Sequence, residues 1–100
     1  MYNSPHSHRR SRAKDHLLWL DIEQSSEAYS RNFIEIARHY PTLSRQELRI
    51  SALVKAELPS WKIGEMLYIS EHAVEKHRSG IRQKMQLPHE INLQTFLVGL

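Results

Sequence analysis

The sequence predicts an all-α fold, and three observations support this class. Apolar residues recur at spacings of three and four through most of the chain, which is the period of a helix. No segment of useful length alternates apolar and polar residues as a strand does. Pro41, Pro59 and Pro88 divide the helical pattern into short elements, because proline interrupts a helix.

The composition limits the size and the chemistry of the molecule. The chain has 100 residues, 40% of them hydrophobic and 25% charged, which fits one soluble domain with a small core. The absence of cysteine excludes disulfides, thiol catalysis and cysteine-ligated zinc. No apolar run approaches the roughly 20 residues that span a bilayer, and the N-terminus lacks the apolar stretch of a signal peptide. We therefore expect a cytoplasmic protein that does not bind membranes.

The N-terminal part of the chain divides into two segments. Residues 1–11 are basic and poor in apolar side chains, so we expect a disordered tail. Residues 12–41 are expected to form a helical linker or a dimerisation arm, with one helix ending near Gln24 and a second beginning near Ser26. The second helix places five apolar residues on one face, namely Tyr29, Phe33, Ile36, Ala37 and Tyr40.

Residues 42–100 carry the strongest helix signals. Ser44 and Glu47 have the spacing of a capping box, in which each side chain bonds the backbone N–H of the other residue. The helix that follows is apolar nearly all round, so it is predicted to be central and buried. Ser60 is predicted to cap a short helix over residues 61–67.

A helix is predicted over residues 71–86, after a tight turn at Tyr68 and Ile69 and an N-cap at Ser70. Two helices joined by so short a turn form a helix-turn-helix. Its apolar side holds Val74, Ile81 and Met85, and its opposite side holds His72, Lys76, Ser79 and Gln83. Such a polar face suits a DNA major groove about 12 Å wide. Periodicity alone is equally compatible with an ordinary amphipathic surface helix.

The last helix, predicted from about Glu90, has apolar residues on two sides. Phe96, Leu97 and Leu100 suit the core of the monomer, whereas Ile91 and Val98 leave apolar surface on a second side. A helix with two apolar sides needs a second partner, and a symmetric copy of the chain is the commonest one. The pattern therefore predicts a homodimer with Ile91, Phe96 and Val98 at its interface.

Three runs, Leu43–Glu47, Ile63–Ser70 and Ala73–Met85, follow one another with the order and spacing of a known helix-turn-helix family. They resemble the LuxR-type C-terminal DNA-binding domain of bacterial transcription regulators, also called the GerE or NarL/FixJ type. The resemblance implies that residues 42–100 are a four-helix LuxR-type domain that binds double-stranded DNA as a dimer. In this family the last helix supplies the dimer contact, and the helix over residues 71–86 would enter the major groove. Gly64 stands where the family usually has alanine, and helix-interior glycine costs about 0.5–1 kcal/mol relative to alanine.

The resemblance also implies which side chains contact DNA. Base contacts fall on Glu75, Lys76 and Ser79, and the helical spacing independently selects Lys76 and Ser79 and adds His72. Glu75 replaces a lysine found in many members, so its carboxylate either accepts from cytosine N4 or weakens the attraction to phosphate. The candidate phosphate contacts are Lys62, Ser70, His77, Arg78, Arg82 and Lys84.

These observations predict a sequence-specific DNA-binding transcription regulator. The alternative is a helical interaction or dimerisation module that keeps the fold without binding DNA. Glu75 and the small net charge of +3 favour this alternative, and the basic run Lys76–Lys84 disfavours it. No paired carboxylates, nucleophile elbow or glycine-rich loop are present, so no enzyme activity, metal or cofactor is expected. Either residues 12–40 are the whole regulatory arm, or the chain is the output piece of a longer protein with a sensor or receiver domain.

Overall fold

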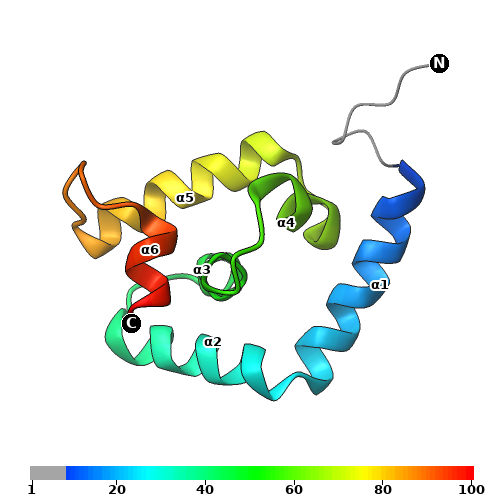
Figure 1. Ribbon diagram of the computed structural model, residues 1–100, viewed down its shortest axis with the longest axis horizontal. Helices are drawn as coiled ribbons and strands as arrows, with labels where there is room; N and C mark the ends of the chain where they lie inside the picture. The colour runs from blue at the N-terminus through cyan, green and yellow to red at the C-terminus, as the bar shows by residue number, and fades with distance from the viewer. Residues whose placement is uncertain (1–8) are drawn as a thin grey trace.

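The computed structural model describes residues 9–100, which form six helices and no strand (Figure 1). The prediction of an all-α fold is confirmed. The helices are α1 (Arg9–Ser25), α2 (Glu27–His39), α3 (Arg45–Lys55), α4 (Ser60–Leu67), α5 (Glu71–Met85) and α6 (Leu93–Val98). Residues 1–8 of the expected tail lie outside the described residues, and α1 begins three residues before the predicted start.

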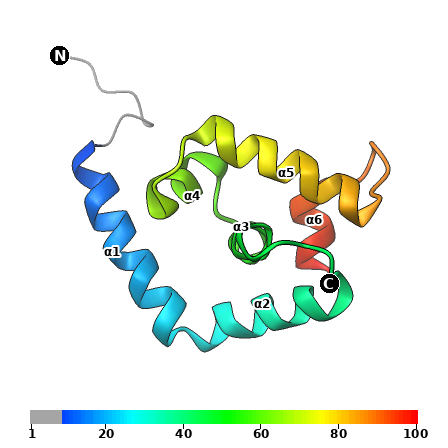
Figure 2. The ribbon, with the colours of Figure 1, turned by 180° about the vertical axis from the view of Figure 1, so that it is seen from behind.

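The third helix is the centre of the fold. Figures 1 and 2 show α3 end-on, with the other helices arranged around it. Five consecutive residues from its middle toward its C-terminal end are buried, as the apolar pattern predicted, and they are Ile50, Ser51, Ala52, Leu53 and Val54. Helices α2, α5 and α6 pack directly on α3, whereas α1 packs mainly on α4.

The first two helices belong to the same core as the residues after them. Trp19 of α1 is buried, and its ring meets that of Tyr29 edge to face with centroids 5.2 Å apart. Ile36 of α2 is fully buried beneath α3. Ser26 caps α2 through a hydrogen bond from the Tyr29 backbone N–H of 3.1 Å. The segment expected to be a linker or arm therefore contributes its own apolar face to the domain.

The start of α3 confirms the predicted capping box and shows a third partner. The Glu47 backbone N–H donates to Ser44 Oγ at 3.1 Å, and the Ser44 N–H donates to Glu47 Oε1 at 2.8 Å. The same oxygen accepts a hydrogen bond from Lys84 Nζ, also at 2.8 Å. This carboxylate therefore connects the beginning of α3 to the last turn of α5.

The turn between α4 and α5 depends on two unusual backbone positions. Tyr68 adopts the left-handed conformation, with φ 60° and ψ 40°, and the Ile69 N–H donates to the carbonyl of Gly64 at 3.0 Å. A Cβ atom on Gly64 would lie 2.7 Å from the carbonyl oxygen of Ile69, so an alanine would force the turn to move. The cost expected for this glycine was therefore wrong in sign, because the turn approaches α4 too closely for a side chain.

Two helix starts differ from their predictions. Ser60 is the first residue of α4, and Pro59 occupies the N-cap position without a side-chain hydrogen bond, so the prediction that Ser60 caps this helix was wrong. Proline at this position sets the extended backbone that precedes a helix. Helix α6 begins three residues later than predicted, because Asn92 caps it by accepting from the Thr95 N–H at 3.0 Å.

We predict that Glu47 makes the stability of the protein sensitive to acid. Burial acts to raise the pKa of Glu47, but hydrogen bonds from Lys84 and Ser44 and the charge of Lys84 outweigh it and hold the pKa below its ordinary value. A carboxyl with a lowered folded-state pKa adds stability above its unfolded pKa of about 4.3 and loses it as the pH falls through the folded value.

Glu47→Gln should therefore lower the free energy of unfolding by about 1–3 kcal/mol at about pH 7. On acidification to about pH 3, the free energy of unfolding of this variant should fall less than that of the parent chain. Urea unfolding at both pH values measures this difference. Glu35→Gln, at an exposed position on α2, is the matched control and should leave both values unchanged. Equal acid sensitivity in Glu47→Gln and the parent chain would contradict the assignment.

Candidate nucleic-acid interface

Helix α5 has a buried side and an open side. Val74 and Ile81 are fully buried and Met85 is 6% exposed, so these residues fix the rotation of the helix on the core. The four candidate base-contacting residues all lie on the exposed part of the surface, and they are His72, Glu75, Lys76 and Ser79. Figure 1 shows α5 along one edge of the molecule with no described helix outside it. The structure therefore leaves a polar strip along α5 accessible.

The charges along this strip are open to a partner. No described residue forms an ion pair or hydrogen bond with the side chain of Lys76 or Glu75. Arg78 and His77 are half-buried at the flanks of the strip. Ser70 is exposed, and its side chain caps the beginning of α5 by accepting a hydrogen bond from the Ala73 N–H at 3.0 Å. The N-terminal end of a helix attracts anions, because its backbone N–H groups point outward there.

Lys62, a candidate phosphate contact, is engaged by the first helix. Its Nζ lies 2.9 Å from Oδ1 of Asp15, a residue that is only 6% exposed. His16 bonds the Met66 carbonyl through Nδ1 at 2.8 Å, and its ring lies 4.3 Å from that of Tyr68. Asp15 and His16 therefore fasten α1 to the first helix of the helix-turn-helix. Nothing in the local sequence signals this contact.

Two other candidate phosphate contacts also hold the fold together. The Arg82 guanidinium donates to the carbonyl oxygens of Pro88 and Ile91, which ties the α5–α6 connection to α5. Lys84 donates to Glu47 at 2.8 Å and to the carbonyl of Thr42 at 3.4 Å. In the free protein these cations position neighbouring segments, and their contact with phosphate stays a prediction.

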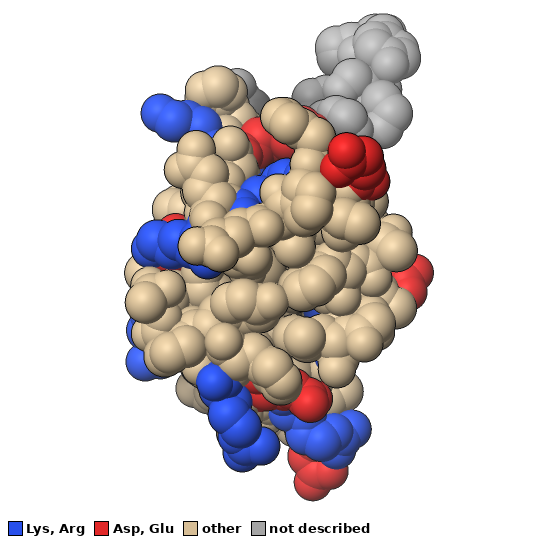
Figure 3. All heavy atoms as spheres, turned by 90° about the vertical axis from the view of Figure 1, so that its left-hand side faces the viewer, with Lys and Arg blue, Asp and Glu red and all other residues tan. Residues whose placement is uncertain are grey.

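The residues predicted at the dimer interface lie at the α6 end of the molecule. Ile91 is 39% exposed and Val98 is 47% exposed, whereas Phe96 is half-buried, with its ring centroid 6.4 Å from that of Tyr40. Figure 3 views this end and shows an uncharged centre, with most of the visible charged side chains nearer its edges. Ile91 and Val98 therefore add exposed apolar surface at an end whose centre is uncharged in this view.

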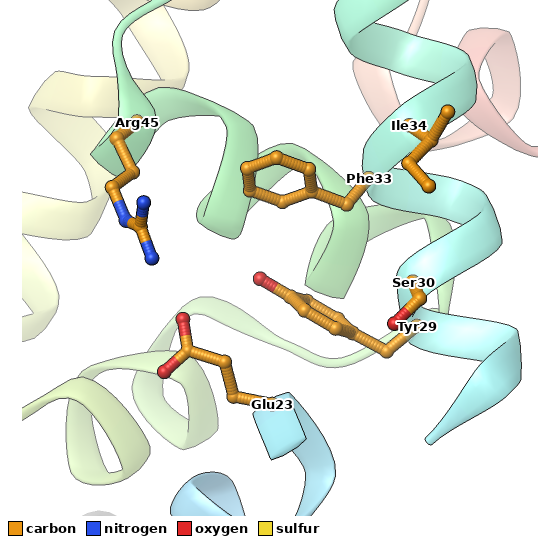
Figure 4. Close-up of a pocket in the computed structure, with 6 residues that line it drawn as sticks. All are labelled: Glu23, Tyr29, Ser30, Phe33, Ile34 and Arg45. Atoms are coloured by element: carbon orange, nitrogen blue, oxygen red, sulfur yellow. The ribbon is translucent and has the colours of Figure 1, made fainter. Parts of the chain in front are cut away.

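A cavity of about 260 Å³ lies on the α2 side of α3, away from α5. Figure 4 shows its lining residues, which are Glu23, Tyr29, Ser30, Phe33, Ile34 and Arg45. Burial, together with the nearby charge of Glu23, raises the pKa of Tyr29 to about 12, so the phenol stays neutral. The Glu23 carboxylate is paired with Arg49 at 2.9 Å. A neutral phenol and an ion-paired carboxylate are poorly suited to general acid–base catalysis near neutral pH.

Across residues 9–100, no three histidine, aspartate or glutamate side chains are grouped to hold a metal ion. Within the same range, no helix is both long enough and apolar enough to cross a membrane.

Comparison with known proteins gives one result for the region that contains the polar strip. The GerE family model, described as bacterial regulatory proteins of the luxR family, matches residues 41–97. This range covers more than half of the chain and includes α3, α4, α5 and most of α6. The chain shows no significant match to curated proteins or to solved structures.

We predict that the Lys62–Asp15 pair is strongly coupled. Lys62→Met should lower the free energy of unfolding by about 1–3 kcal/mol, because it leaves the buried Asp15 carboxylate without a counter-ion. Adding Asp15→Asn to this variant should restore part of the loss, since the uncompensated charge is then removed. Urea unfolding of the two single variants and the double variant measures the coupling. If the effects of the two substitutions on the free energy of unfolding were additive, Lys62 and Asp15 would not be coupled.

Proposed function

Because the chain belongs to the LuxR family of bacterial regulatory proteins, we propose that it is a sequence-specific transcription regulator. In this proposal α5 lies in the major groove of double-stranded DNA. The exposed polar strip of α5 carries the proposal. His72, Lys76 and Ser79 face outward and no described segment covers them, while the opposite side of the helix is buried. A helix held in this way presents several hydrogen-bonding side chains to the edges of the bases.

The side chains of the strip differ in what they recognise. Lys76 donates to the O6 and N7 acceptors of guanine, and Glu75 accepts from the N4 amino group of cytosine. Ser79 and His72 donate or accept and so discriminate less between bases. Lys76 is therefore expected to contribute most to sequence preference. Glu75 is expected to favour cytosine at the base pair that it faces.

The flanking cations keep donors available for phosphate. Lys62 and Arg82 each use only part of their N–H donors in the contacts described above, so a phosphate oxygen can bind the same group without breaking them. Arg78, His77 and the N-terminal end of α5 near Ser70 complete the proposed phosphate contacts. Contacts of this kind position the protein on the duplex and do not select a base.

A dimer through α6 completes the proposal. Ile91 and Val98 supply exposed apolar surface, and Phe96 supports it from the core side. A two-fold pair of such domains presents two copies of α5, which suits two half-sites about 34 Å apart on one face of the duplex.

We expect Lys76→Ala to change the base preference and to weaken binding to the best site by about 1–3 kcal/mol. Selection of bound fragments from random DNA, followed by titration of parent and variant on the selected site and on scrambled DNA, measures both effects. Arg38→Ala on the exposed side of α2 is the control with the same loss of charge. An equal loss of affinity on every sequence would mean that Lys76 contacts phosphate and that the groove assignment is wrong.

The dependence of binding on salt separates DNA binding from the alternative of an interaction module. If about six phosphates are neutralised, affinity should fall about a thousandfold between about 50 and about 200 mM salt. An apolar protein–protein contact would respond little over this range. Arg82→Ala should reduce the salt slope by about one. An unchanged slope would limit Arg82 to holding the α5–α6 connection.

A further inference from the structure

Helix α1 exposes apolar side chains on the side that faces away from α4. Leu17 is 67% exposed and Leu20 is 42% exposed, although Trp19 between them is buried. Ala13 and Gln24 are exposed on the same side. Figures 1 and 2 show α1 at the edge of the molecule, with no described helix beyond it. The domain therefore does not use this surface for its own core.

Four of the exposed residues have the spacing of a helix–helix seam, whereas Leu18, which is 47% exposed, lies outside it. Ala13, Leu17, Leu20 and Gln24 are separated by four, three and four residues. At 100° per residue they fall within about 60° of one another around the helix. This is the a/d spacing by which two helices pack side by side in a coiled coil. The buried Asp15 and Trp19 lie on the opposite side, where α1 contacts α4.

Two opposite charges flank the seam on one edge. Lys14 follows Ala13 and Asp21 follows Leu20, so the two charges occupy the same heptad position one repeat apart. Both residues are exposed, and neither pairs with another described residue. In an antiparallel pair of identical helices this position faces itself. Lys14 of each copy then lies beside Asp21 of the other copy.

We propose that α1 is a self-association surface, on which a second copy of this chain docks α1 against α1 in antiparallel orientation. The seam and the two charges are self-complementary under a two-fold axis, which is the condition for a contact between identical copies. A parallel pair would not bring Lys14 and Asp21 together. The contact is separate from the α6 surface and does not depend on DNA binding.

The contact is expected to be weak. The seam spans about three turns of one helix, which is smaller than the roughly 800 Å² per partner of a standard interface. A dissociation constant on the order of 10–100 µM is therefore expected. The starting material is the full chain carrying Val98→Glu. This substitution places a charge on the proposed α6 interface, so that the α1 contact can be measured alone.

Exchange of the two charges tests the proposal. Lys14→Glu and Asp21→Lys each place like charges at both contacts of a pair, so each variant alone should associate at least about fivefold more weakly. An equimolar mixture of the two variants has complementary charges at both contacts, as does the double variant, and both should recover the association. Sedimentation velocity over a concentration range that brackets the expected constant measures these changes.

Matched controls lie on another helix. Glu35→Lys and Arg38→Glu make comparable charge changes on the exposed side of α2 and should have no effect. Leu17→Glu should abolish association, while circular dichroism confirms that the helices remain. A chain that stays monomeric throughout, or a mixture of Lys14→Glu and Asp21→Lys that associates no better than either variant, would overturn the proposal. Binding of the Leu17→Glu variant to a single isolated DNA site would be unaffected in either case.

Discussion

The carboxylate of Glu47 sets the position of α5, and every contact proposed for the polar strip depends on that position. It closes the capping box with Ser44 at the start of α3 and accepts from Lys84 in the last turn of α5. The buried Val74 and Ile81 fix the rotation of the same helix. A change of register by one residue would turn α5 by 100° and move its polar side chains against the core. Specific recognition of bases by α5 therefore depends on the contacts that hold the opposite side of this helix on the core.

The features that could be predicted are those encoded within a few residues. The capping box, the Ser70 cap and the turn at Tyr68 depend on neighbours three to five residues away, so the sequence pattern contains both partners. The apolar pattern of α3 likewise shows that it is central, because it has no polar side to expose. The local sequence pattern does not indicate where two segments that are far apart in the sequence come into contact.

The cations show this limit most clearly. Lys84 pairs with a residue 37 positions away and Lys62 with one 47 positions away, and no local signal marks either pair. A lysine on the polar side of a helix is expected to face solvent, so the sequence alone assigns both lysines to phosphate. The turn next to Gly64 is a further case, because its close approach to α4 follows from the packing of α5 and reverses the usual preference for alanine. The side of α1 that is buried also depends on its contact with α4, through Asp15 and His16.

The two proposed contacts between copies lie on different parts of the chain, and this determines how they would act together. Helices α6 and α1 lie at opposite ends of the molecule (Figures 1 and 2), so one second copy cannot occupy both surfaces. Two separate two-fold contacts instead extend an assembly beyond a dimer. A weak α1 contact stays largely open in dilute solution. Dimers held side by side on DNA meet at an effective concentration that reaches about the millimolar range, which is enough to close the contact. Its weakness would thus confine association through α1 to neighbouring sites on the same duplex.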